Sequence, residues 1–140
     1  MYWDKEIETM DRTALERMQI ERLAQTLEWA SRSPYYAERL KAAGVDARSV
    51  RTVADVAKFP LTTKDDLREH WPYGFLAVGR DELIRMHSSS GTTGRATVIF
   101  HTAGDIAAWT HIVARSMYMT GMRRSDVFQN MMTYGLFTGG

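Results

Sequence analysis

The sequence predicts an α/β protein, with a helical N-terminal region over residues 1–75 and the start of a sheet over residues 76–140. Up to about residue 70, apolar residues recur at helical spacing between helix caps and prolines. After Gly74, short runs of β-branched and aromatic residues take over, and such runs are typical of strands. The change of pattern near Gly74 is the expected boundary between the two parts.

The first two helices are predicted from their caps. Thr13-Ala14-Leu15-Glu16 is a capping-box pattern with Thr13 as the N-cap, so the first helix should begin there. Ser33 and Pro34 suit the cap and the first position of a second helix. Gly44 should end that helix, because glycine readily takes the left-handed conformation that follows a helix.

Shorter elements are expected further along the chain. Residues 52–58 and 63–70 each suit a short helix that is closed by a proline soon after its last turn. Residues 84–87 alternate between apolar and polar side chains, and residues 97–100 are β-branched or aromatic. Both runs therefore predict strands, and they bracket a segment rich in Ser, Thr and Gly.

The end of the chain predicts one more helix and a further strand. Thr102-Ala103-Gly104-Asp105 resembles a helix cap, and the helix should run to Gly121. Residues 127–132 are typical of a buried strand, and a glycine-rich turn follows them. A buried-type strand at the end of a domain has nothing to pair with or cover it. We therefore expect the front part of a longer protein, and a complete small α+β domain with a frayed tail is the alternative.

Composition excludes several classes of function. With 18 Lys and Arg against 17 Asp and Glu, the net charge of +1 gives no bias toward nucleic acid or an anionic membrane. The absence of cysteine excludes disulfides, thiolate nucleophiles and cysteine-ligated metals. The N-terminus has no signal-peptide pattern and no stretch is long enough to span a bilayer, so we expect a cytoplasmic protein. The histidines lack metal-ligand spacing, so no metal site is expected.

One segment carries chemistry. Residues 88–94 contain five hydroxyl side chains and two glycines in seven positions. Glycines let backbone N–H groups converge on a phosphate, and Ser and Thr add short hydrogen-bond donors. The glycine spacing excludes a Walker loop and a dinucleotide fingerprint. A solvated hairpin connection is the alternative. The segment indicates a polyphosphate site made of Ser88, Ser89, Ser90, Gly91, Thr92, Thr93 and Gly94.

This loop resembles the phosphate-binding signature of the adenylate-forming superfamily. The matching run is Ser89-Ser90-Gly91-Thr92-Thr93-Gly94-Arg95-Ala96-Thr97, and it departs from the signature at Ala96, where proline is usual. Ser88-Ser89-Ser90, and Thr97 where most of the superfamily has lysine, resemble the phenylacetate–CoA ligase branch. Other segments agree with that branch: Tyr2-Trp3-Asp4, Ser33-Pro34-Tyr35-Tyr36, residues 59–67, Tyr73-Gly74 and residues 134–140.

The resemblance implies a ligase that works in two steps. A carboxylate attacks the α-phosphate of Mg²⁺-bound ATP to give an acyl-adenylate and pyrophosphate, and the thiol of coenzyme A then displaces AMP. Residues 88–94 would hold the β- and γ-phosphates at the start of an AMP-binding domain. The family's Mg²⁺ ligand, ribose-binding aspartate and catalytic lysine lie downstream. ATP, Mg²⁺ and coenzyme A are therefore expected for the full-length enzyme, and the chain alone should be inactive.

The resemblance also implies a pocket for the aryl acid. Residues 134–140 match a segment beside the bound acid, so Tyr134 and Phe137 are candidates for an apolar wall, with ordinary core aromatics as the alternative. His87, just before the loop, is a candidate phosphate donor or proton carrier, or else a simple strand-end residue.

Other functions remain open at this point. The same loop would suit another aryl-CoA ligase, or the synthetase that adenylylates a deazaflavin cofactor. A different class is a non-catalytic helical interaction module in which the loop is only a linker. The expected partners are a small aryl acid, ATP, coenzyme A and a second copy in a homodimer, with neither nucleic acid nor membrane.

Overall fold

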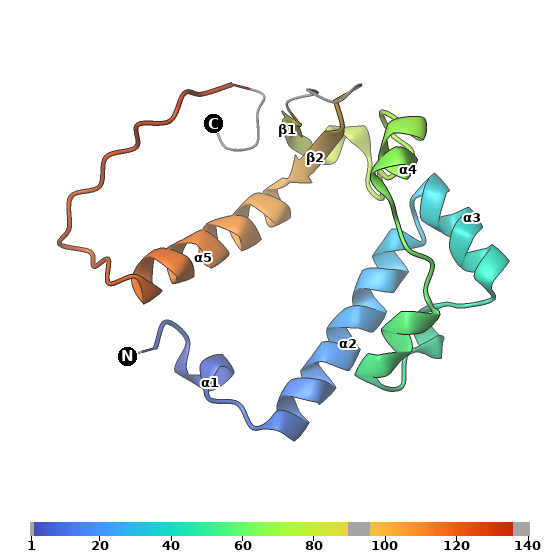
Figure 1. Cartoon of the computed structure of the whole chain (residues 1–140), viewed down its shortest axis with the longest axis horizontal. Coiled ribbons are helices and arrows are strands. Elements are labelled where there is room, and N and C mark those ends of the chain that lie inside the picture. The colour runs from blue at the N-terminus through green and yellow to red at the C-terminus, as the bar shows by residue number, and fades with distance from the viewer. Residues whose placement is uncertain (1, 90–95, 136–140) are drawn as a thin grey trace. The chain divides into compact units, whose positions relative to one another are not determined.

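The computed structural model describes residues 2–89 and 96–135 (Figure 1). Two compact units are present. One is Met10–Arg80, and the other consists of the described residues of Met1–Thr9 and Asp81–Gly140. The first is helical and the second carries the sheet, so the predicted class, a helical region followed by the first strands of a sheet, is confirmed. The boundary near residue 75 stays a prediction. Across the described ranges, no helix is long and apolar enough to cross a bilayer.

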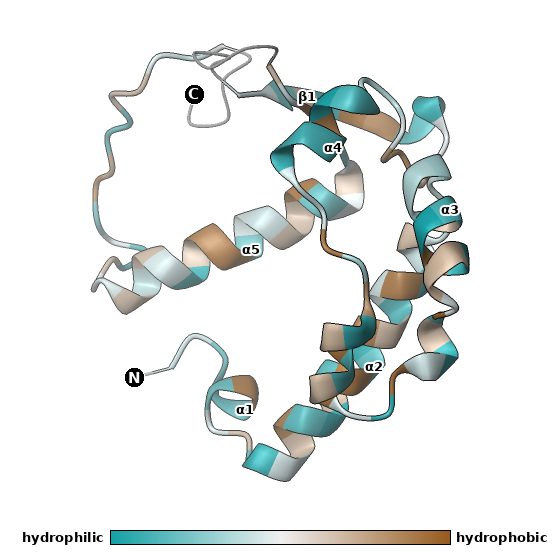
Figure 2. Ribbon diagram, turned by 45° about the vertical axis from the view of Figure 1, so that its right-hand side comes forward, coloured by the Kyte–Doolittle hydropathy of each residue, from teal (hydrophilic) through white to brown (hydrophobic). Residues whose placement is uncertain are grey.

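Helix α2 (Arg12–Ala30) is the long helix of the first unit, and apolar and hydrophilic residues alternate along it (Figure 2). Asp11 caps it, because its carboxylate accepts from the amides of Thr13 and Ala14 at 2.9 and 3.0 Å. The predicted N-cap at Thr13 is therefore wrong by two residues. The Glu16 side chain does not complete the predicted capping box, since it forms an ion pair with Arg12 one turn earlier at 2.7 Å.

Helix α3 (Pro34–Ala43) begins and ends where the sequence predicts. Ser33 is fully buried, and its hydroxyl accepts from the Tyr36 amide and donates to the Ala30 carbonyl. Gly44 follows the helix with a φ of +65°, which L side chains rarely adopt. These two residues fix both ends of α3.

The short helices of this unit are also confirmed. The 3₁₀ helix η2 (Val53–Lys58) follows Thr52, and helix α4 (Lys64–Glu69) lies between Thr63 and His70. Asp55 and Asp66 each accept from the amide three residues earlier, at 2.7 Å in both cases. The pattern did not predict the single turns α1 (Lys5–Glu8), η1 (Ala47–Ser49) and η3 (Arg80–Glu82).

A small core holds the first unit together. Leu27, Leu40 and Val50 are buried at its centre, and partly buried apolar residues surround them: Ile20, Leu23, Tyr36, Val45, Ala47 and Phe59. A second cluster consists of aromatic rings, in which buried Tyr35 packs against His70 and Phe75 at centroid distances of 4.8 and 4.2 Å. Both clusters bring α3 against segments distant in sequence.

The second unit is built on a hairpin and a helix. Strands β1 (Leu83–Ser88) and β2 (Val98–Thr102) are antiparallel, and helix α5 (Ala103–Met119) follows β2 directly (Figure 1). Thr102 caps α5 and accepts from the Asp105 amide at 3.2 Å, as its sequence predicts. The N-terminal segment packs on α5, where the Trp3 ring lies 5.6 Å from that of Tyr118.

The predicted buried strand over residues 127–132 is wrong for this structure. These residues form neither helix nor strand, and Val127 and Met131 are 99% and 85% exposed. A β-prone apolar run becomes a buried strand only where another strand and a second layer lie beside it. Within the described ranges, nothing pairs with this run.

Candidate functional site

The candidate phosphate site lies at the tip of the β1–β2 hairpin. Ser88 faces Val98 across the ladder, and His87 faces Ile99 in the next pair. The predicted strands on both sides of the loop are therefore confirmed, and they join its two ends into one antiparallel frame. Such a frame fixes where the loop begins and ends.

The frame continues one residue past the strands through Ser89 and Thr97. The Ser89 amide donates to the Thr97 carbonyl at 2.9 Å, and the Thr97 amide donates to the Ser89 hydroxyl at 3.0 Å. Thr97 is buried, so its amide needs this partner. We call these two residues the neck of the loop. Nothing in the sequence pattern singled out the pairing, because a serine next to a glycine-rich run is equally typical of a phosphate donor.

Of the seven predicted phosphate-binding residues, only Ser88 and Ser89 lie within the described part of the chain. Ser88 is the last residue of β1 and is half-buried. The Ser89 hydroxyl accepts at the neck, which leaves its proton available for donation. The others fall outside the described residues: Ser90, Gly91, Thr92, Thr93 and Gly94. The assignment of the seven to ATP phosphates stays a prediction.

Three aromatic rings, from β1, β2 and α5, pack together close to the neck. The His87 and His101 rings have centroids 4.9 Å apart, and the Trp109 ring lies 5.4 Å from each. His87 is only 6% exposed, so the strand-end histidine of the sequence is a buried side chain. Burial, and then the neighbouring His87, lower the pKa of His101 below its usual value near 6.5. His101 is therefore neutral at pH 7.

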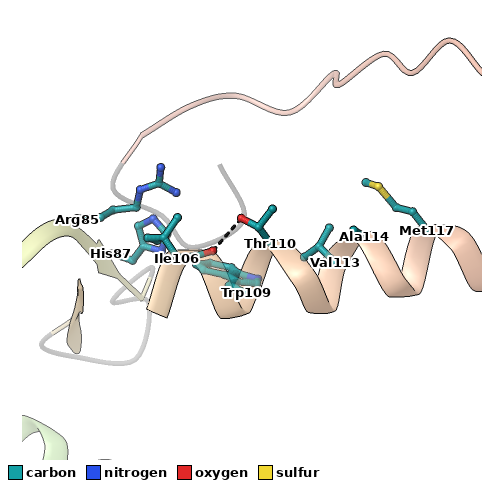
Figure 3. A pocket seen from close by; sticks show the side chains of 8 residues that line it. All are labelled: Arg85, His87, Ile106, Trp109, Thr110, Val113, Ala114 and Met117. Carbon is teal, nitrogen blue, oxygen red and sulfur yellow. Dashed lines mark hydrogen bonds between the residues drawn. The ribbon is translucent and has the colours of Figure 1, made fainter. Parts of the chain in front are cut away.

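The same face of α5 forms one side of a groove of about 360 Å³. Figure 3 shows Arg85 and His87 at one end of the groove and Met117 toward the other, with Trp109 and Val113 between them. The groove therefore has a basic end and an apolar length. Its polar end, lined by Arg85 and His87, lies on strand β1 of the hairpin that carries the loop.

The predicted acid-pocket residues are not brought to this groove in the described part of the chain. Tyr134 is 79% exposed, and its hydroxyl accepts from the Asn130 side-chain amide at 3.1 Å. Phe137 lies outside the described residues. The assignment of both residues to an aryl pocket stays a prediction. In residues 2–89 and 96–135, no group of three or more His, Asp or Glu side chains could hold a metal ion.

Comparison with solved structures gives the class of protein. The chain matches 2-hydroxyisobutyryl-CoA ligase in complex with 2-HIB-AMP and CoA with a TM-score of 0.81 and 32% identity, over 89% of this chain and 28% of that one. The same ligase in its postadenylation state gives 0.81 and 29%, over 89% and 27%. The fold is therefore that of the N-terminal region of an adenylate-forming CoA ligase.

Comparison with curated sequences gives the family. The chain is 42% identical to the phenylacetate–coenzyme A ligase of Thermus thermophilus, over 100% of this chain and 32% of that protein. It is 43% identical to those of Pseudomonas putida and Escherichia coli, over 96% of the chain and 31% of each relative. No family model matches the chain. The chain is homologous to the N-terminal third of phenylacetate–coenzyme A ligases and spans about a third of their length.

Proposed function

We propose that this chain supplies the phosphate-binding part of a phenylacetate–CoA ligase, an acid–thiol ligase that adenylates phenylacetate with ATP and passes the acyl group to coenzyme A. One observation carries the proposal. A loop of Ser, Thr and Gly is mounted on a hairpin closed at its neck, in a chain 42–43% identical to phenylacetate–CoA ligases. We expect the enzyme to act in the cytoplasm, where ATP and coenzyme A are available, and to form a homodimer.

The chemistry of the loop suits a leaving group that must be held and then released. Hydroxyl and backbone N–H donors can stabilise the charge that develops on the β- and γ-phosphates as the carboxylate attacks. None of residues 88–94 carries a formal charge, so the pyrophosphate is not retained by an ion pair. The hairpin neck keeps the two ends of the loop together throughout.

Mg²⁺ would neutralise phosphate charge when it is bound with ATP. The donors of this loop are hydroxyls and amides, which suit phosphate oxygens rather than a hard cation, since Mg²⁺ prefers carboxylate ligands. The described residues offer no acidic cluster for it. We therefore assign the loop to the phosphates of ATP and place the ligands of Mg²⁺ elsewhere in the enzyme.

The test uses a hybrid enzyme, in which this chain replaces the matching N-terminal part of the Escherichia coli phenylacetate–CoA ligase. Thr92→Ala with Thr93→Ala removes two donors from the loop. If each bond to charged oxygen contributes about 1.5–3 kcal/mol, losing both should slow adenylation by roughly two to four decades. Thioester formation from supplied phenylacetyl-adenylate should slow much less, because the β- and γ-phosphates have already left.

The two half-reactions are measured separately, by pyrophosphate exchange and by coenzyme A consumption with supplied acyl-adenylate. The matched control is Thr26→Ala with Thr120→Ala, which removes two exposed helix hydroxyls that bond only to local carbonyls. It should leave both rates unchanged. Equal slowing of both half-reactions in the loop variant, or no slowing of adenylation, would show that the loop is structural.

The nature of the acid is a separate point. The curated relatives at 42–43% identity favour phenylacetate, whereas the solved neighbour at 32% identity is named for a 2-hydroxy acid. The hybrid enzyme should therefore show a higher kcat/KM for phenylacetate than for 2-hydroxyisobutyrate. A preference for another aryl acid, or for a deazaflavin substrate, would keep the adenylation chemistry and replace the substrate. A properly folded hybrid without adenylation would favour the interaction module.

A further inference from the structure

The rings of two histidines lie side by side on the hairpin close to the neck, and the Nδ1 atom of each makes no hydrogen bond within the described residues. His87 on β1 and His101 on β2 share one face of the hairpin, since Arg85 faces His101 and His87 faces Ile99 in the ladder. The Nδ1 atoms of both rings are buried, and neither has a partner in the part of the chain that the structure describes. Buried polar atoms are nearly always paired, so this arrangement needs a reason.

The surroundings of the His101 ring favour its neutral form. Trp109 of α5 stacks on His101 with an interplanar angle of 25° and meets His87 edge-on at 75°. Arg85 of β1 adds a positive charge that lowers the pKa of His101, while Asp105 of α5 raises it by less than burial lowers it. The Asp105 carboxylate already accepts from the amide and hydroxyl of Thr102, both at 2.8 Å.

The histidine pair is only one ladder step from the neck. Along the ladder, His87 faces Ile99, and Ser88 faces Val98 in the next step. The neck residues Ser89 and Thr97 follow directly after that step. A positive charge on His101 would be buried against the His87 ring and near Arg85, which disfavours close packing of the strands there. Loss of that packing would act first on the hydrogen bonds of the neck.

We propose that His87 and His101 are positioning residues for the phosphate loop: the packed rings hold its neck closed while His101 is neutral, and protonation of His101 opens it. The proposal rests on the phosphate-binding function of the loop proposed above. On this proposal the loop binds the β- and γ-phosphates more weakly at acid pH. The histidines act on the loop through the two strands and do not contact the nucleotide.

The sign of the effect follows from proton linkage. His101 has a lower pKa in the folded chain than the ordinary 6.5, so the unfolded or opened state binds more protons. The closed neck is therefore most stable above pH 6.5 and loses stability as the pH falls below that value. The loss levels off once the folded-state pKa has been passed.

The first measurement is amide hydrogen exchange of the 140-residue chain, with protection factors corrected for the intrinsic effect of pH. Protection of the Ser89 and Thr97 amides should fall severalfold between pH 7.5 and pH 5, because the opened state binds more protons than the closed one. His101→Phe keeps a ring against Trp109 and loses no hydrogen bond at Nδ1, so it should fold and abolish most of this fall. His111→Gln removes a histidine elsewhere on α5 and should keep the fall in full.

Several results would overturn the proposal. One is protection at the neck that does not change with pH in the unaltered chain, and another is an undiminished change in His101→Phe. If that variant does not fold, imidazole nitrogen shifts of the unaltered chain decide the matter. Titration of His101 that coincides with loss of neck protection supports the proposal, and titration without any loss contradicts it.

The second measurement is binding of pyrophosphate to the same chains across the same pH range. The unaltered chain and His111→Gln should lose affinity in acid more steeply than His101→Phe, although pyrophosphate itself titrates identically in all three. If pyrophosphate binds to none of them, the function proposed for the loop fails, and the exchange data still decide whether the pair holds the neck. Equal pH dependence in all three chains would show that the pair does not act on the loop.

Discussion

Ser89 and Thr97 are joined by two hydrogen bonds, one from the Ser89 amide to the Thr97 carbonyl at 2.9 Å and one from the Thr97 amide to the Ser89 hydroxyl at 3.0 Å. In the second bond the Ser89 side chain, and not its backbone, is the acceptor, so the pairing of the two strands extends one residue past their ends. A serine that the loop motif predicts to bind phosphate therefore also closes the loop where it joins the strands. The neck links the fold of the hairpin to the proposed hold on ATP.

Removal of the Ser89 hydroxyl should loosen the neck. Ser89→Ala leaves the buried Thr97 amide without its acceptor, which costs about 1–3 kcal/mol at that site. Hydrogen exchange of the Thr97 amide should accelerate by roughly one to two decades. Ser116→Ala is the matched control, because its exposed hydroxyl bonds only to the Ile112 carbonyl one turn earlier. Unchanged exchange at Thr97 in Ser89→Ala would mean that the backbone bond alone closes the neck.

The stability contributed by Asp55 should depend on pH. Its buried carboxylate pairs with Lys58 at 2.6 Å and accepts from the amides of Arg51 and Thr52, and these contacts hold its pKa well below 3.8. This contribution is complete above pH 3.8 and is lost as the pH falls through the lowered, folded-state pKa. Asp55→Asn should therefore reduce the free energy of unfolding at pH 7, and the difference from the unaltered chain should shrink below pH 3.8.

Urea unfolding at pH 7 and at pH 2.5 measures that difference. Asp65→Asn is the control, since the Asp65 side chain is 76% exposed and pairs only with Arg68 in the contacts described. It should change the unfolding free energy little at either pH. An Asp55→Asn effect of equal size at both pH values would contradict the assignment of the carboxylate as the stabilising group.

Gly74 should not tolerate a side chain. A Cβ at this position would lie 2.5 Å from the Cβ of His70 and 2.6 Å from its carbonyl oxygen. The backbone cannot easily shift, because the Gly74 amide donates to His70 and its carbonyl accepts from the Tyr35 amide at 2.8 and 2.9 Å. Gly74→Ala should therefore lower the free energy of unfolding by about 1–3 kcal/mol.

Gly104 provides the matched comparison in thermal or urea unfolding. It lies in the first turn of α5, and a Cβ there would meet only the Thr102 hydroxyl at an ordinary 3.6 Å. Gly104→Ala should raise the unfolding free energy by about 0.5–1 kcal/mol, since alanine loses less backbone entropy in a helix. The same sign for both variants would show that packing at Gly74 is not the controlling factor.

Replacement of Tyr134 tests whether its side chain lines the acid pocket or packs in the core. Because its side chain is 79% exposed, Tyr134→Ala should change the stability of this chain by less than about 0.5 kcal/mol. In the hybrid enzyme the same variant should raise the KM for phenylacetate by roughly 2- to 13-fold and leave that for ATP unchanged, the effect of one lost aromatic contact. Tyr134→Phe keeps the ring and should behave as the unaltered enzyme does. Phe137→Ala is expected to act as Tyr134→Ala does, and an unchanged preference for aryl over short aliphatic acids in both would remove them from the pocket.

Much of the secondary structure follows from residues that act on their near neighbours. Ser33, Thr63 and Thr102 each bond to an amide three residues later, so local spacing was enough to predict the helices that they begin. The phosphate loop was predicted for a similar reason, because its glycines and hydroxyls are adjacent in the chain. The cap of α2 was missed because Asp11 and Thr13 are both suitable N-cap residues, and the helix begins at the earlier of the two, where Asp11 accepts from the Thr13 and Ala14 amides.

Local sequence was enough to predict where α3, α4 and α5 begin and which runs form the hairpin, since each depends on residues within a few positions of one another. The phosphate chemistry of the loop stays a prediction from the same kind of local pattern. Only the tertiary structure decided that Ser89 closes the neck on Thr97, and that His87, His101 and Trp109 form one buried cluster, because these contacts join separate elements. It also decided against a strand over residues 127–132. Whether a β-prone run becomes a strand depends on a partner beside it, and no local pattern encodes that partner.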